Sequence, residues 1–184
     1  TLNSVLVDGK LDMSAVGLSD EDIKKIDQIC IVACGSAYHV GVAAQYVIED
    51  LAQIPVRTEL ASEFRYRKPL LSKNELVIIV SQSGETADSL AALRLAKEKG
   101  IKTLGIVNVV GSSIAREADN VFYTLAGPEI AVATTKAYST QLIAAYCLAI
   151  QFAIVRGTID EAKYLELIQE MAQLPDKIPK DYRG

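Results

Sequence analysis

Apolar and amphipathic segments alternate regularly along the chain. Five short runs rich in β-branched residues predict strands, because such side chains suit an extended backbone that is buried on both faces. These runs lie at 29–33, 55–60, 77–80, 102–107 and 120–125. Apolar residues at helical spacing predict helices, which lie at 20–26, 37–52, 85–99, 113–118, 134–155 and 160–174.

This order of elements predicts an α/β fold, a three-layer α/β/α sandwich around a five-stranded parallel sheet. The second strand carries Pro55, Arg57 and Glu59 among apolar neighbours, which indicates a position at the edge of the sheet. We therefore expect the flavodoxin-like strand order 2-1-3-4-5. In that order the first and third strands are neighbours, and the topological switch point, where such sheets bind ligands, lies between them.

The domain organisation follows from the same pattern. Residues 1–18 show no sustained period and are expected to form an irregular N-terminal arm, whereas Ser19 and Asp22 predict a capped helix start directly after it. Residues 19–175 are expected to form one domain with a single core. Residues 176–184 surround Pro179 and are expected to begin a linker to a further domain. A chain that starts at Thr1 without methionine is expected to be a piece of a longer protein.

Charge and cysteine content narrow the class of protein. The 19 basic and 23 acidic residues give a net charge of −4, and the basic ones are scattered, so neither nucleic acid nor a membrane is an expected partner. The longest apolar run, 142–155, is shorter than the roughly 20 residues of a membrane span and predicts a buried helix. Cys30, Cys34 and Cys147 form no C-x-x-C pair and are expected to be reduced core residues of a cytoplasmic protein.

The most informative stretch is V-I-I-V-S-Q-S-G-E-T at 77–86, where a buried strand runs into a hydroxyl-rich turn before a helix. The side chains that gather at the unpaired N–H groups of this helix are Ser81, Gln82, Ser83 and Thr86. A helix start with such donors suits phosphate, although a simple capped helix with Ser83 as N-cap explains the same letters. The turn Gly35-Ser36 follows the neighbouring first strand, so both turns are predicted to line one crevice.

The sequence lacks the motifs of several common nucleotide-binding and hydrolase sites. It has no G-x-x-x-x-G-K-[ST], no G-x-G-x-x-G after the first strand and no G-x-S-x-G around a candidate serine. His39 and three dispersed cysteines make no metal-ligand set, so we expect neither a metal nor a cofactor; His39 is interpreted as a helix-surface or core residue.

Three further features have open interpretations. Glu85 is either a catalytic carboxylate or a residue selected by the helix dipole, and Lys136 is either a site lysine or a partner in an outward or inter-subunit salt bridge. The polar segment 61–69 is a loop or short helix, and its Arg65, Tyr66 and Arg67 face either a partner or solvent.

Five blocks of the sequence resemble the isomerase part of the glutamine:fructose-6-phosphate aminotransferase family, and within it the first of two sugar isomerase (SIS) domains. The blocks are C-G-S-A-Y-H at 34–39, A-S-E-F-R-Y-R at 61–67, S-Q-S-G-E-T-A-D at 81–88, N-V-V-G-S-S at 108–113 and E-I-A-V-A-T-T-K-A at 129–137. The resemblance covers the chain from about residue 20. It implies an SIS-type fold and a hexose phosphate ligand, either fructose 6-phosphate or glucosamine 6-phosphate.

The resemblance also implies a set of substrate-binding residues. Phosphate is expected at the turn formed by Ser81, Gln82, Ser83 and Thr86. Ser36 is expected to contact sugar and phosphate, whereas Ala37 stands where the family has a hydroxyl residue and offers only its backbone N–H. Val132 and Ala133 are expected to touch the sugar through their backbone, with Thr134 in place of the family's serine.

In the family, the histidine, lysine and glutamate that open the sugar ring, form a Schiff base and move the proton lie in the second SIS domain or the following tail. The chain is therefore expected to contain no catalytic residue and to bind hexose phosphate without turnover, although the parent enzyme starts amino sugar biosynthesis. The resemblance implies a second SIS domain and a glutaminase domain as partners, and a homodimer. Two alternatives are the sugar-phosphate-sensing domain of a transcriptional regulator and a pure dimerisation unit.

Overall fold

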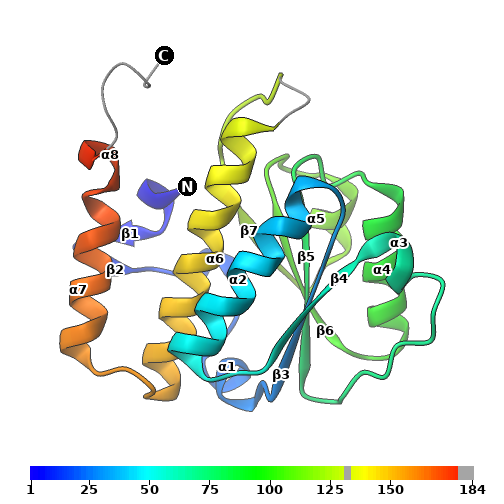
Figure 1. Cartoon of the computed structure of the whole chain (residues 1–184), viewed down its shortest axis with the longest axis horizontal. Coiled ribbons are helices and arrows are strands. Elements are labelled where there is room, and N and C mark those ends of the chain that lie inside the picture. Colours follow the sequence, from blue (N-terminus) through cyan, green and yellow to red (C-terminus); the bar gives the residue numbers. More distant parts are fainter. Residues whose placement is uncertain (131–133, 178–184) are drawn as a thin grey trace.

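A five-stranded parallel sheet forms the centre of the computed structural model of the chain, which describes residues 1–130 and 134–177 (Figure 1). Its strand order is β4-β3-β5-β6-β7. The strands span Gln28–Ala33 (β3), Val56–Leu60 (β4), Glu75–Ser81 (β5), Lys102–Val107 (β6) and Asn120–Tyr123 (β7). The predicted α/β/α fold, the parallel pairing and the order 2-1-3-4-5 are confirmed, and β4 lies at the edge as its polar residues indicated.

Helices cover both faces of this sheet. One face packs against α1 (Asp20–Lys25), α2 (Ser36–Ala52) and α6 (Thr135–Arg156), with α7 (Glu161–Ala172) outside α6 and the short α8 (Leu174–Lys177) after it. The other face packs against α3 (Ala61–Phe64), α4 (Ala87–Glu98) and α5 (Ser113–Glu117). Alternate strand residues enter the two cores: Ile29 and Ile31 of β3 face α2 and α6, whereas Cys30 and Val32 face the other layer.

The N-terminal arm is more ordered than the sequence indicated. It contains the 3₁₀ helices η1 (Leu2–Ser4) and η2 (Ser14–Val16) and a hairpin of β1 (Leu6–Val7) with β2 (Lys10–Leu11). Val5, Met13 and Val16 are buried in the core on the α2 and α6 side of the sheet. Elements of two or three residues are too short to produce a periodic pattern, which explains the expectation of an irregular arm. The capping box of Ser19 and Asp22 at the start of α1 is confirmed.

The helix α6 is a core helix. An 18-residue window within its 22 residues has a mean hydropathy of 1.5, so its length and composition alone would also suit a membrane span. Half of that window is buried inside the fold, and the helix packs along α2, which confirms the prediction of a buried helix. Cys147 on α6 and Cys30 on β3 are buried, and burial raises the pKa of each thiol to about 12. Cys34 is only half-buried.

Candidate functional site

A cavity of about 320 Å³ opens at the carboxyl ends of β3 and β5, between the first turns of α2, α4 and α6. Its main lining residues are Gly35, Ser36, Ala37, Ser81, Gln82, Ser83, Thr86, Ser89, Thr134 and Gln141. The structure therefore confirms that the two polar turns share one crevice. It brings together six of the eight predicted site residues, whereas Val132 and Ala133 lie outside the described residues.

The β5–α4 turn supplies most of the hydroxyl groups. Ser81 is buried at the end of β5, and its Oγ accepts a hydrogen bond from the Gly84 N–H at 3.1 Å. The same Oγ lies 3.2 Å from Thr86 Oγ1. Ser83 Oγ accepts from the Glu85 N–H at 3.2 Å. These short contacts hold the serine and threonine oxygens on one side of the cavity.

The predicted start of the following helix is wrong by two residues. The helix α4 begins at Ala87 with Thr86 at the N-cap position, so Ser83 is not the N-cap. The reason lies in Gly84, whose φ of +68° does not occur within a right-handed helix. The backbone from Ser81 to Glu85 instead forms a turn whose own N–H groups bond to its serine side chains.

The β6–α5 turn packs behind the β5–α4 turn of the cavity and holds it in place. A Cβ atom on Gly84 would lie 2.1 Å from Ser112 Oγ, so only glycine fits against this buried serine. The Ile114 N–H donates to the Gly84 carbonyl at 3.0 Å, and the Asn108 N–H donates to the Gln82 carbonyl at 3.1 Å. The block at 108–113 thus positions the turn without lining the cavity, a role that the sequence alone did not indicate.

Glu85 belongs to the same support. Its carboxylate is exposed and accepts a hydrogen bond from the Ser113 N–H at 2.7 Å, and bonds from Ser113 hold the pKa of this carboxyl below its ordinary value. Glu85 does not line the cavity. Of the two interpretations, the structure supports a role at a helix start and gives no geometric support for a catalytic carboxylate.

The β3–α2 turn closes the other side. Gly35 is the N-cap of α2 with φ +57° and ψ −134°, a conformation that glycine alone adopts readily. Ser36 Oγ lies 3.0 Å from Oγ1 of Thr134, the N-cap of α6. Thr134 itself has a left-handed backbone, with φ +56° and ψ +49°, which is uncommon for a β-branched residue. This contact ties the starts of α2 and α6 together at the cavity mouth.

The cavity has the electrostatics of an anion site without a charged side chain. Within residues 1–130 and 134–177, no lysine, arginine, aspartate or glutamate lines it. The starts of α2, α4 and α6 all border it, and each helix N-terminus carries about half a positive elementary charge. Three such ends, with free hydroxyl and N–H groups, favour a compact anion such as a phosphate group.

Two other candidates lie away from the cavity wall. Lys136 is exposed, does not line the cavity, and donates from Nζ to the Pro128 carbonyl at 2.9 Å; its interpretation as an outward or inter-subunit salt-bridge partner stays a prediction. His39 is exposed on α2 with its ring edge-on to Tyr38, which confirms the helix-surface interpretation. The described residues contain no group of three potential metal ligands.

A family model described as SIS domain matches residues 22–151. The chain belongs to the SIS domain family. It is 54% identical to a glutamine–fructose-6-phosphate aminotransferase (isomerizing) of Caldanaerobacter subterraneus over 95% of this chain and 29% of that protein. It is also 54% identical to the protein of that name from Clostridium tetani, over 98% of this chain and 30% of the relative. The chain thus spans less than a third of the length of these relatives.

A solved structure shows the same fold for this SIS domain. The C-terminal domain of glucosamine-fructose-6-phosphate aminotransferase from Francisella tularensis superimposes with a TM-score of 0.88 at 38% identity. The match covers 94% of this chain and 48% of that one. The sugar isomerase domain of an RpiR transcription factor from Sphaerobacter thermophilus is more distant, with a TM-score of 0.65 at 21% identity, and shows the shared fold alone.

The SIS domain also has cavity residues that the sequence motifs did not reveal. Gln141 on α6 and Ser89 on α4 both line the cavity and are 2% and 1% exposed. Gln141 is a polar residue within an otherwise apolar helix face, between Ala137 and Ala144. That interruption was the available signal in the sequence.

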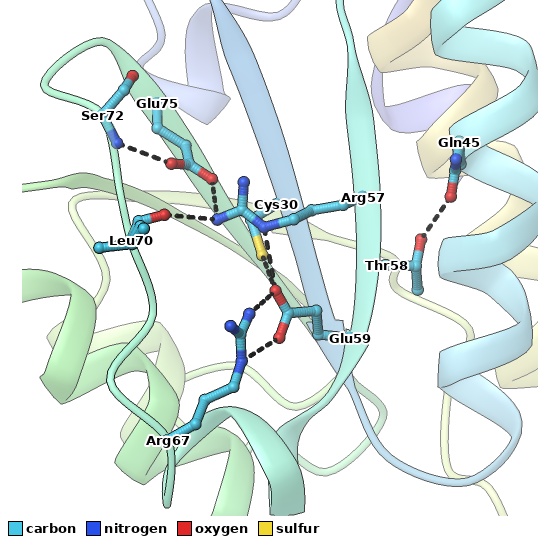
Figure 2. Close-up of polar contacts among 9 residues, drawn as sticks. All are labelled: Cys30, Gln45, Arg57, Thr58, Glu59, Arg67, Leu70, Ser72 and Glu75. Atoms are coloured by element: carbon cyan, nitrogen blue, oxygen red, sulfur yellow. Dashed lines mark hydrogen bonds and ion pairs between the residues drawn. The ribbon is translucent and has the colours of Figure 1, made fainter.

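A second polar region of the SIS domain extends from the edge strand β4 across β3 to the start of β5 (Figure 2). We name it the edge ion cluster; it consists of Arg57, Glu59, Arg67 and Glu75. Arg57 bridges the two glutamates, with Nη2 2.5 Å from Glu75 Oε1 and Nε 3.0 Å from Glu59 Oε1. Arg67 Nε donates to Glu59 Oε2 at 2.9 Å.

The two carboxyl groups of the edge ion cluster differ in their titration. Burial raises the pKa of Glu75 above its ordinary value, although the hydrogen bond from the Ser72 N–H and the charge of Arg57 act to lower it. Burial acts in the same direction on Glu59, but hydrogen bonds from Arg67 and Arg57 outweigh it and hold the pKa of Glu59 below its ordinary value.

Arg65 pairs with Asp88 at 2.6 Å. Of the three residues expected to face a partner or solvent, only Tyr66 is largely free, at 80% exposure.

Proposed function

We propose that this SIS domain binds a hexose 6-phosphate in the cavity between the β3–α2 and β5–α4 turns, and that it is the first SIS domain of a glutamine:fructose-6-phosphate aminotransferase. The observation that carries the proposal is the convergence of neutral donors and three helix starts on one cavity of about 320 Å³. That volume lies at the lower end of the range for small-molecule sites. The ligand is fructose 6-phosphate or glucosamine 6-phosphate.

In this proposal the phosphate lies against the β5–α4 turn, where its oxygens accept from the hydroxyls of Ser81, Ser83 and Thr86 and from Gln82. Ser36 and the N–H of Ala37 complete the contacts from α2, and Val132 and Ala133 touch the sugar. A phosphate dianion can accept from each of these groups, and helix ends supply the positive potential that no side chain provides.

The parent enzyme of the proposal joins ammonia to fructose 6-phosphate and isomerises the product. The cavity lining in the described residues contains no histidine, lysine, aspartate or glutamate, the side chains that most often carry out such a proton transfer. Because each such group contributes about 10²- to 10⁴-fold, we propose that the chain binds without turnover. A second SIS domain, a glutaminase domain and a second copy of the chain are proposed as its partners in the cytoplasm.

The regulator alternative has less support. Identity to the aminotransferases is 54%, whereas the regulator domain shares 21% identity and supports only a common fold.

Isothermal titration of the purified chain tests the proposal. We expect heat with fructose 6-phosphate and glucosamine 6-phosphate, and a loss of affinity of about tenfold or more in a Ser83→Ala/Thr86→Ala double variant, because each hydroxyl donates to an anion. Ser139→Ala, on the exposed side of α6, is the matched control and should bind as the wild type does. The proposal is contradicted if neither hexose phosphate gives heat, or if the double variant binds with the same affinity as the wild type.

The absence of turnover needs a separate assay. We expect no glucosamine 6-phosphate when the chain is incubated with fructose 6-phosphate and ammonia. Product formation above the uncatalysed rate would show that a catalytic group has been missed.

A further inference from the structure

Gln141 is a buried polar side chain of the cavity that has no hydrogen-bond partner among the described residues. The residue is 2% exposed and lines the cavity from the second turn of α6. Its side chain makes no hydrogen bond within the described part of the chain. Ala137, Ala144 and Ala145 around it on the helix are buried and apolar, so they offer no side-chain partner.

Two other buried polar side chains near the cavity, Asn108 and Ser81, make hydrogen bonds within the fold. Asn108 donates from Nδ2 to the Gly127 carbonyl at 2.8 Å and accepts at Oδ1 from Thr124 and from the Ala126 N–H. Ser81 accepts from the Gly84 N–H. A buried amide without a partner is unfavourable, because it has lost its hydrogen bonds to water without replacement. Gln141 is held in the cavity wall by packing, and its amide is available to a partner that is not part of the fold.

The chemistry of the amide selects the kind of partner. It both donates and accepts, as sugar hydroxyls do, whereas phosphate oxygens at neutral pH mainly accept. The helices α4 and α6 cover opposite faces of the sheet, so Gln141 reaches the cavity from the side opposite the Thr86 end of α4. A phosphate on the β5–α4 turn would leave its sugar to extend toward α6.

We propose that Gln141 binds hydroxyl groups of the sugar and so distinguishes a hexose phosphate from inorganic phosphate. The inference rests on the proposed function and assigns the sugar half of the ligand to α6. Gln141 acts as a binding residue, and no step of chemistry is assigned to it.

The test compares Gln141→Met with the wild type in thermal unfolding and in titrations with fructose 6-phosphate and inorganic phosphate. Methionine has a similar volume and neither donor nor acceptor groups. We expect the free variant to unfold within about 2 °C of the wild type, since the substitution removes no hydrogen bond of the fold. Fructose 6-phosphate affinity should fall about tenfold, the loss expected for one hydrogen bond, and phosphate affinity should change less than about twofold.

Two further variants sharpen the result. Gln151→Met makes the same change on the same helix outside the cavity and should leave both affinities unchanged. Gln141→Asn retracts the amide by one methylene and should weaken fructose 6-phosphate binding while sparing phosphate. Equal weakening of both ligands, an unchanged fructose 6-phosphate affinity, or a Gln141→Met chain that unfolds several degrees earlier or fails to fold would each overturn the inference.

The outcomes also separate the two proposals. A wild type that binds neither hexose phosphate rejects the proposed function and the inference with it. A wild type that binds fructose 6-phosphate while Gln141→Met binds it equally well rejects the role of Gln141 alone.

Discussion

The cavity and the edge ion cluster are both polar, yet their side chains differ in what they bond to. In the cavity the groups are neutral and several have donor capacity left over, as in Gln141 and the hydroxyls of Ser83 and Thr86. In the edge ion cluster the groups are charged and bond to one another, with Arg57 shared between Glu59 and Glu75 (Figure 2).

The comparison shows that charge alone is a poor guide to a ligand site. Arginines and glutamates in a block such as A-S-E-F-R-Y-R attract attention in a sequence, but here Arg65 and Arg67 pair within the domain. The Glu75 side chain is fully buried, so Arg57 compensates a charge that would otherwise be costly. Unused hydrogen-bonding capacity around an open cavity is the more informative feature.

The largest effect that tests this comparison is expected at Arg57. Arg57→Met removes the cation beside the buried Glu75 and should destabilise the chain by about 3–5 kcal/mol, measured by urea unfolding at pH 7. Affinity for fructose 6-phosphate should stay unchanged, provided that it is measured well below the unfolding transition. Arg94→Met, which breaks the exposed pair with Glu117, is the control and should cost about 0–1 kcal/mol. Similar costs in the two variants would contradict a structural role for the edge ion cluster.

A smaller effect on stability, accompanied by loss of binding, is expected at Gly84. Gly84→Ala combines a φ of +68° with a Cβ that would overlap Ser112 Oγ, and should cost about 2–4 kcal/mol. The turn must move, so hexose phosphate affinity should also fall. Gly111→Ala is a matched control, because its φ is +73° but no atom lies within 4 Å of the new Cβ. It should cost about 1 kcal/mol and leave binding intact. Equal binding losses in both variants would show that strain and not the Ser112 contact is decisive.

The smallest effect concerns pH and Glu59. The pKa of Glu59 is lower in the folded state than its ordinary value of 4.5, so its pairing stabilises the fold above that pH. This stabilisation is lost as the pH falls through the folded pKa. Glu59→Gln should therefore be about 1–2 kcal/mol less stable than the wild type at pH 7, and the difference should shrink between pH 5 and about pH 3.

Glu166→Gln, in an exposed pair with Lys163, is the control for this pH series. It should differ from the wild type by only a few tenths of a kcal/mol at either pH. A Glu59→Gln deficit that persists undiminished at low pH would exclude ionic pairing as its cause.

Much of the candidate site was predictable because its residues follow strands directly. The ends of neighbouring parallel strands meet at one edge of a sheet, so Ser36 and Ser81 were placed in one crevice once the strand order was inferred. The boundary of α4 was predicted wrongly, since the serine-rich letters suit both a helix cap and the turn that Gly84 makes. Ser112 behind Gly84 was not predicted, because nothing local relates two residues on different βα turns.

The sequence by itself determined the alternation of strands and helices, the edge position of β4 and the crevice between β3 and β5, because periodicity and strand order are properties of neighbouring residues. Only the tertiary structure decided which polar groups find partners. Arg57 meets Glu75 across β3, Ser112 fills the space beside Gly84, and Gln141 reaches the cavity from α6 without a partner. Each of these depends on packing between segments far apart along the chain, where small shifts decide whether a hydrogen bond forms.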